Sequence, residues 1–275
     1  MKKTVILLSG ILLLFFLYSC RKNKTTDLNP DVNVSNDVIL SVSSYTALFN
    51  LLIKARLDPF LATHGNTMID SVSITCDSLK TEYEFDFFSA ISPDSVRRSG
   101  TIIVLLSGDI LQKGSYAKLF FQSYYEDYGK VDAMDSITNE GTNTSGQVVF
   151  SETISHGSIN KAIGGGTISV NLACRYKTQA SQLVPGQDIL FLVKGDISGL
   201  SSKGYPFSAS VRDTLEDLFS CPWIRDGIID VHVPDVEITG GYIDFVTADG
   251  CSDLIWYYFD TSAFKLRKNQ FYLKN

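Results

Sequence analysis

From residue 66 onward, the sequence consists of short segments in which apolar and polar residues alternate with a period of two. The clearest segment is 81–87, where acidic and aromatic side chains fall on opposite faces of an extended chain. Gly, Asn, Asp and Ser interrupt the pattern about every 10 to 15 residues, as turns between antiparallel strands do. Strands do not alternate with helical segments, so a parallel sheet is not expected.

We therefore expect a mainly β fold: an antiparallel meander that forms a sandwich or a curved, half-barrel-like sheet, with one N-terminal helix packed on it. Strands are predicted at 81–87, 101–106, 116–125, 131–138, 146–155, 166–175, 188–195, 205–212, 223–232, 239–247, 253–260 and 263–273. A short helical turn is predicted at 213–219, before Pro222 interrupts the meander. The region contains no long linker, so residues 37–275 are expected to form a single domain.

Residues 37–62 form the one convincing helical region. Its apolar residues recur at steps of three and four: Val38, Val42, Tyr45, Leu48, Phe49, Leu52, Ile53 and Leu57. Pro59 should stop or kink the helix. Such a helix could lie on a membrane, but its polar face is rich in Ser and Thr, and only Lys54 and Arg56 are basic. A helix that fills a β core is the favoured alternative.

The first 19 residues have the pattern of an export signal. Lys2 and Lys3 precede an apolar run over residues 5–18, about 21 Å long as a helix and shorter than the ~30 Å core of a bilayer. Ser19-Cys20 then resembles a lipobox, which predicts a signal peptide (1–19) and acylation of Cys20. An ordinary signal peptide followed by a chance cysteine is the alternative. The polar stretch 20–36 is predicted to be a flexible tether to the membrane.

Charge and motifs exclude several function classes. The chain has 275 residues, 44% of them hydrophobic, and a formal net charge of −6, which becomes −8 once Lys2 and Lys3 are removed (−6 − 2). An acidic chain without a basic block is not expected to bind nucleic acid. The three histidines lie far apart, and no nucleophile elbow, phosphate loop or zinc spacing is present. We expect no catalytic residues, no metal, no cofactor and no enzymatic activity.

Four cysteines remain beyond Cys20. In an antiparallel hairpin the numbers of paired residues have a constant sum, and the midpoint of Cys221 and Cys251 is residue 236. A turn-like stretch, 233–237, lies at that midpoint, so we predict a Cys221–Cys251 disulfide. For Cys76 and Cys174, buried free thiols are favoured over a second bridge.

One predicted strand suggests a surface for a ligand or partner. Tyr116, Phe120 and Tyr124 share a face of strand 116–125 with polar residues, while the opposite face is more apolar. Aromatic rings between polar groups are suited to stacking on sugar rings or to contacting a protein. The alternative is a strand that is covered on both faces.

A resemblance covers most of the chain. It is carried by the short signal that ends at Cys20, by the early helix, by Gly-Thr-Ile-Ile-Val at 100–104, and by the segments that begin at Cys221 and end at Cys251. These features resemble uncharacterised secreted lipoproteins of the Bacteroidota. The resemblance implies an exported, β-rich protein at the outer membrane. Surface-exposed members tend to be acidic after the cysteine, whereas residues 21–24 are Arg-Lys-Asn-Lys, which favours the periplasmic face.

These features predict a membrane-anchored lipoprotein that acts as a non-catalytic envelope interaction module or glycan-binding module. Its partners would be the membrane, through acylated Cys20, and an envelope protein or glycan. The alternative is a periplasmic carrier of lipid or of another apolar ligand, enclosed between a curved sheet and the helix. A β domain with a hollow interior would favour the carrier, and a β domain with a filled interior would favour the interaction module.

Overall fold

The computed structural model describes residues 30–275, apart from residues 128, 163–164, 180–182, 235–239, 246–249, 260–266 and 273–275. The predicted signal peptide, Cys20 and most of the predicted tether lie outside the described residues. From Asp31 onward the chain forms one compact unit.

Two helices precede the strands: α2 (Pro30–Leu57) and α3 (Pro59–His64). The strands are β1 (Asn66–Ile69), β2 (Val72–Cys76), β3 (Glu82–Ile91), β4 (Arg97–Leu106), β5 (Tyr116–Glu126), β6 (Gly129–Thr142), β7 (Val148–Asn160), β8 (Thr167–Thr178), β9 (Leu190–Leu200), β10 (Pro206–Leu218), β11 (Asp226–His232), β12 (Gly240–Asp244), β13 (Leu254–Phe259) and β14 (Arg267–Tyr272). Every strand predicted from the alternation is present. The hairpin β1–β2 was not predicted, and the helical turn predicted at 213–219 is instead strand, as part of β10.

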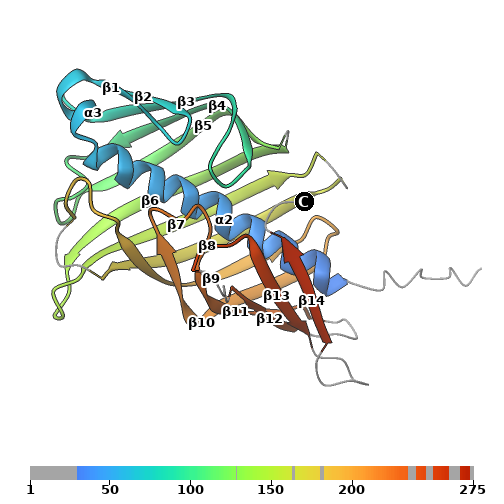
Figure 1. Cartoon of the computed structure of the whole chain (residues 1–275). Helices are drawn as coiled ribbons and strands as arrows, with labels where there is room; N and C mark the ends of the chain where they lie inside the picture. The colour runs from blue at the N-terminus through green and yellow to red at the C-terminus, as the bar shows by residue number, and fades with distance from the viewer. Residues whose placement is uncertain are drawn as a thin grey trace, which may run out of the picture. The chain divides into compact units, whose positions relative to one another are not determined.

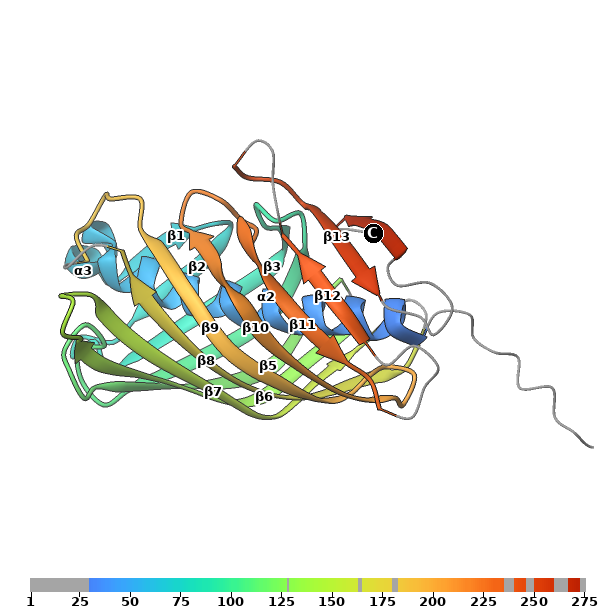
Figure 2. The ribbon, with the colours of Figure 1, turned by 90° about the horizontal axis from the view of Figure 1, so that it is seen from below.

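All fourteen strands belong to one antiparallel sheet in which each strand pairs with its neighbours in the sequence. The sheet is strongly curved, and α2 lies along its concave side (Figure 1). The view from below shows the middle strands β5–β10 passing around the helix (Figure 2). Among the described strands, β1 and β14 do not pair with each other, so the sheet stays open. Of the predicted architectures, the curved sheet with a packed helix is the one that forms.

The helix fills the concave side because its large apolar side chains point into the sheet. Tyr45, Leu48, Phe49, Leu52 and Ile53 are all buried. The ring of Phe49 stacks on Tyr176 with 3.8 Å between centroids, and it meets Phe150 and Phe191 edge-on at 5.6 and 5.1 Å. Such aromatic groups bury large apolar areas and fix ring geometry. The prediction that the helix fills a β core is confirmed.

The helix boundaries differ from the predicted ones. α2 begins at Pro30, so residues 30–36 are helical rather than part of a flexible tether. Proline is well tolerated in the first turn, where its missing N–H has no helical partner. The predicted break at Asp58-Pro59 is confirmed, because the Asp58 Oδ1 atom accepts the backbone N–H of Leu61 at 2.6 Å and caps α3. Residues 33–57 are long and apolar enough to cross a membrane, but most of this segment is buried against the sheet.

Candidate ligand-binding groove

One stripe of α2 remains uncovered by the sheet. From residue 33 to residue 54 every side chain is buried except those at seven positions spaced three and four residues apart. These are Asn33, Asn36, Leu40, Ser43, Ala47, Asn50 and Lys54. This spacing places them on a single face of the helix. Apart from Leu40, the stripe carries small or polar side chains, whereas most of the large aromatic and aliphatic side chains of α2 lie on its buried faces.

A groove lies over this stripe, on the open side of the sheet. Its larger part has a volume of about 420 Å³ and its smaller part about 340 Å³. Ala47 and Asn50 of α2 line both parts. Figure 1 looks onto this side of the molecule, with β3–β5 beyond one flank of α2 and β13 beyond the other. We call this region the α2 groove.

The first wall of the α2 groove contains a buried ionic network. The Arg98 guanidinium donates to both oxygens of Asp94, at 2.8 and 2.6 Å, and to Glu126 Oε1 at 3.0 Å. Glu126 also accepts hydrogen bonds from the hydroxyls of Tyr124, at 2.8 Å, and Ser44, at 2.5 Å. Arg98 and Glu126 are only 5% and 7% exposed. Because each charge has several partners, this wall is a rigid, internally satisfied element.

A β-bulge in β5 brings Tyr124 into this network. Ser99 pairs with Tyr125 but Thr101 pairs with Gln122, so Ser123 and Tyr124 together oppose Gly100. Ser123 has φ of +50°, and a Cβ on Gly100 would lie 1.9 Å from the Ser123 carbonyl oxygen. The bulge reverses the inside–outside alternation. The prediction that Tyr124 shares an exposed face with Tyr116 and Phe120 is therefore wrong, since Tyr124 is fully buried.

Tyr116 and Phe120, before the bulge, are 42% and 45% exposed on the convex face. Leu105 on the neighbouring strand is 40% exposed. The ammonium of Lys118 lies 5.7 Å from the centre of the Tyr116 ring. The structure thus separates the three predicted aromatic residues. Tyr116 and Phe120 lie on an apolar patch of the convex face, whereas Tyr124 is buried and donates a hydrogen bond to Glu126 in the first wall of the α2 groove.

The second wall is formed by the end of β10 and the segment that follows it. Asp217, on β10, and Trp223 and Ile224, after it, line the α2 groove together with Ile255 of β13. Asp217 lies on the buried side of β10 together with Phe207, Ala209, Val211 and Leu215. The pairing of β10 with β9 shifts by two residues between Ser210 and Leu215, so the alternation of residues 205–212 continues in phase to Asp217. The stretch 213–219 was predicted as a helical turn, and this is why the sequence did not place Asp217 on the inner face.

A disulfide between Cys221 and Cys251 ties this wall together. Ile228 pairs with Asp244, and 228 + 244 equals 221 + 251, so the bridge lies on the extended register of the β11–β12 hairpin. The predicted Cys221–Cys251 pairing is confirmed. The midpoint, residue 236, lies outside the described residues. Cys76 and Cys174 are free thiols, and Cys174 is buried while Cys76 is partly exposed.

Asp217 and Asn50 meet across the α2 groove. The Asn50 side-chain N–H donates to Asp217 Oδ1 at 2.9 Å. Asp217 Oδ2 and Asn50 Oδ1 have no hydrogen-bond partner among the described residues, although both atoms are buried. Burial raises the pKa of the Asp217 carboxyl to about 7, against the weaker opposing effects of Asn50 and Lys54. This wall, unlike the first, contains a carboxylate whose hydrogen-bonding capacity is incompletely used.

A second pair of buried acids lies in the core below α2. Burial raises the pKa of Asp135 and Glu152, and Glu152 reinforces the shift of Asp135. The Tyr176 hydroxyl donates to Glu152 Oε2 at 2.6 Å, while both oxygens of Asp135 lack partners among the described residues. Neither acid lines the α2 groove. The described residues contain no cluster of three ligating side chains for a metal ion.

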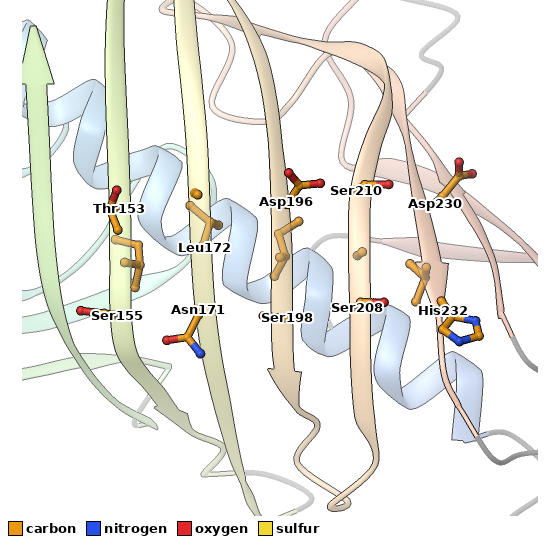
Figure 3. Close-up of a pocket in the computed structure, with 15 residues that line it drawn as sticks. Thr153, Ser155, Asn171, Leu172, Asp196, Ser198, Ser208, Ser210, Asp230 and His232 are labelled. Carbon is orange, nitrogen blue, oxygen red and sulfur yellow. The ribbon is translucent and has the colours of Figure 1, made fainter. Parts of the chain in front are cut away.

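The convex face carries a separate shallow basin of about 580 Å³ across β7–β11. Figure 3 shows its polar side chains on the side of the strands opposite α2. They are Thr153, Ser155, Asn171, Asp196, Ser198, Ser208, Ser210, Asp230 and His232. Ala173 lies among them. None of the described buried atoms without a partner belongs to this basin, so the α2 groove is the stronger candidate site.

Comparisons of the chain with models of protein families, with curated protein sequences and with solved structures give no match. The case for a site therefore rests on the geometry of the α2 groove itself.

Proposed function

We propose that this chain is a lipid-anchored, non-catalytic binding module of the cell envelope that holds its ligand in the α2 groove. The observation that carries this proposal is the uncovered stripe of α2. All other faces of the helix are packed against the sheet, whereas this face presents Asn36, Ser43 and Asn50 to a groove. Buried polar groups without partners are costly, so such a floor favours contact with water or with a polar ligand.

The lining of the α2 groove suits a glycan. Trp223 supplies an aromatic surface, and Asn36, Asn50 and Asp217 supply hydrogen-bonding groups. Sugar rings combine an apolar face with hydroxyls at the rim, and a lining of this mixed kind matches both. The volume also falls within the range of about 300 to 1,000 Å³ that is typical of ligand sites.

The buried network of the first wall leaves no free carboxylate for catalysis. The carboxylates of the first wall are engaged by Arg98, Tyr124 and Ser44, so neither of them is free to act as a general base. The carrier of an apolar ligand is the alternative function. It is less favoured because the side chains of Tyr45, Phe49 and Leu52 occupy the concave side that such a ligand would need.

Anchoring is proposed to occur through a diacylated Cys20, with Arg21, Lys22 and Lys24 close to anionic headgroups on the periplasmic face of the outer membrane. Cys20→Ser should move the protein from the membrane fraction to the soluble fraction. Metabolic labelling with a fatty acid should mark the wild-type chain and leave this variant unlabelled. A labelled variant would contradict the anchor site.

Binding is tested with a pair of matched variants. Ala47→Trp places a large ring on the floor of the α2 groove, and Ala173→Trp makes the same change on the exposed basin. The full-length chain, in non-ionic detergent, is applied to an array of defined bacterial envelope saccharides. We expect wild type and Ala173→Trp to bind the same saccharides and Ala47→Trp to lose them.

Loss of binding by Ala173→Trp alone would place the ligand on the convex face and overturn the proposal. If the array is blank and native mass spectrometry finds lipid bound to the wild-type chain, the carrier function is favoured instead.

A further inference from the structure

The α2 groove has unused hydrogen-bonding capacity where Asn50 and Asp217 meet. Asp217 is 2% exposed, yet one of its carboxylate oxygens has no partner among the described residues. The adjacent amide oxygen, Asn50 Oδ1, is unpartnered too. Both residues line the α2 groove. Asn50 already uses an N–H on Asp217 Oδ1, so the two unpartnered atoms at this point are both acceptors.

The cations around the α2 groove are engaged elsewhere. Arg98 donates to Asp94 and Glu126. Lys161 Nζ is 3.0 Å from Asp37 Oδ1, at the far end of the groove. Lys54, which follows Asn50 by one helical turn, is 2.7 Å from Asp70 Oδ2. Among the described residues, therefore, no cation pairs directly with Asp217.

The charge balance of the larger part of the groove points the same way. Four carboxylates line it, those of Asp94, Glu126, Asp127 and Asp217, against the two cations Arg98 and Lys161. Arg98 serves two of the carboxylates and Lys161 pairs with Asp37, which does not line the groove. An isolated buried carboxylate is destabilised unless a positive charge reaches it.

Resting on the proposed function, we infer that the Asn50–Asp217 end of the α2 groove binds a primary ammonium group of the ligand. An ammonium has three donors and no acceptor, and it brings the positive charge that Asp217 lacks. A neutral hydroxyl would satisfy one acceptor and leave the charge uncompensated. A metal ion is not supported, because the described residues contain no group of three His, Cys, Asp or Glu side chains that could hold one.

Two sources in an envelope carry this group, an amino sugar and the ethanolamine headgroup of a lipid. They share the ammonium and differ in the part of the ligand that would follow it along the groove. Glucosamine and glycerophosphoethanolamine represent the two sources. N-acetylglucosamine and glycerophosphocholine are their respective controls, because neither carries a primary ammonium.

The minimal test uses n-butylammonium and n-butanol, titrated calorimetrically against the full-length chain in non-ionic detergent at pH 8. We expect n-butylammonium to bind at least tenfold more tightly than n-butanol. Asp217→Asn, which keeps the shape and removes the charge, should weaken n-butylammonium binding at least tenfold. Asp196→Asn removes an exposed carboxylate of the convex basin, outside the groove, and should change it less than twofold.

The affinity for n-butylammonium should also rise between pH 5 and pH 8, because the Asp217 carboxyl, whose pKa is raised to about 7, ionises over that interval. Two charged groups interact with Asp217: Lys54 on α2, which lowers the pKa of Asp217, and Glu152 on β7, whose own pKa is raised by Asp217. Asn50 donates a hydrogen bond to Asp217. The same titration with Asp217→Asn should show no such rise.

Equal affinity for n-butylammonium and n-butanol would overturn the inference, as would an Asp217→Asn variant that binds like wild type. If Asp217→Asn does not fold, Asn50→Leu removes the second acceptor and carries the same test. Saccharide binding that is blocked by Ala47→Trp but insensitive to amines would leave the proposed function standing and this inference refuted. Preference for glucosamine over N-acetylglucosamine, or for glycerophosphoethanolamine over glycerophosphocholine, identifies the source.

Discussion

Glu126 and Asp217 are buried carboxylates on opposite walls of the same groove, and they differ in how they are satisfied. Glu126 accepts hydrogen bonds from Arg98, Tyr124 and Ser44, so both of its oxygens are occupied. Asp217 receives a single hydrogen bond, from Asn50, and one oxygen is left over. The comparison separates two uses of a buried charge. A saturated network fixes a wall in place, and an unsaturated carboxylate is available to a ligand and to a proton.

The largest expected effect comes from breaking the saturated side. Arg98→Met removes the cation from two carboxylates, Asp94 and Glu126, and leaves Glu126 buried without its charge partner. Removing one partner of a buried ion pair costs about 3 to 5 kcal/mol. Urea denaturation should show a loss of this size in the free energy of unfolding. Arg212→Met, which breaks an exposed pair with Asp230, should cost less than about 1 kcal/mol in the same assay.

The disulfide next to the unsaturated side gives the second effect. Cys221 and Cys251 are 30 residues apart in sequence, and a closed loop of this length stabilises a folded chain by about 3 to 4 kcal/mol in the chain-entropy model. The double variant Cys221→Ser/Cys251→Ser should lower the free energy of unfolding by this amount. Cys174→Ala provides a control in which no bridge is lost. A reducing agent that leaves the wild-type denaturation midpoint unchanged would contradict the prediction.

The third effect concerns pH and distinguishes Asp217 directly. Its pKa is about 7 in the folded protein and close to the ordinary 3.8 when unfolded, so the folded state retains a proton that the unfolded chain releases. The free energy of unfolding therefore falls as pH rises from about 4 to 7, by up to ~1.4 kcal/mol per pH unit, and the loss persists above pH 7.

Asp217→Asn removes this dependence. We expect the variant to match wild type at pH 4 and to be more stable by about 1 to 3 kcal/mol at pH 8, as measured by denaturation at both pH values. Parallel stability profiles of wild type and variant between pH 4 and 8 would contradict a raised pKa of Asp217.

The smallest effect tests the core acids. Tyr176→Phe removes the donor to Glu152, whose pKa burial raises to about 8, and should lower the free energy of unfolding by about 1 kcal/mol. Tyr116→Phe makes the same change on the half-exposed convex face and should have no measurable effect. Two equal losses would mean that the hydrogen bond to Glu152 contributes nothing specific.

The sequence predicts the architecture of this protein well and the residues of its groove poorly. Alternation of apolar and polar residues indicates where a strand runs and which of its faces is buried, as long as the pairing is regular. Strands such as β8 and β13 were therefore predicted close to their observed bounds. A one-residue bulge reverses the alternation after it, as in β5, where Tyr124 lies on the inner face contrary to simple alternation. Asp217 is in phase with the inward residues of β10, but residues 213–219 were predicted as a helical turn instead of strand.

The floor of the α2 groove has a signal in the sequence. Asn36, Ser43 and Asn50 recur at intervals of seven, which places these polar side chains on one face of the helix. The walls had no comparable signal, because Arg98, Asp94 and Glu126 are brought together by turns and pairing registers that single residues do not reveal.

The order of the strands in the sheet follows their order in the chain without exception. A protein that crosses a membrane as an extended chain, N-terminus first, can then add one hairpin after another as each strand emerges, with few long loops to close. Helix α2 emerges before any strand. Its 28 largely apolar residues are therefore exposed to aggregation until the sheet surrounds them. Under the proposed export, the amino-terminal helix, rather than any strand, is therefore the part of this chain for which a chaperone would matter most.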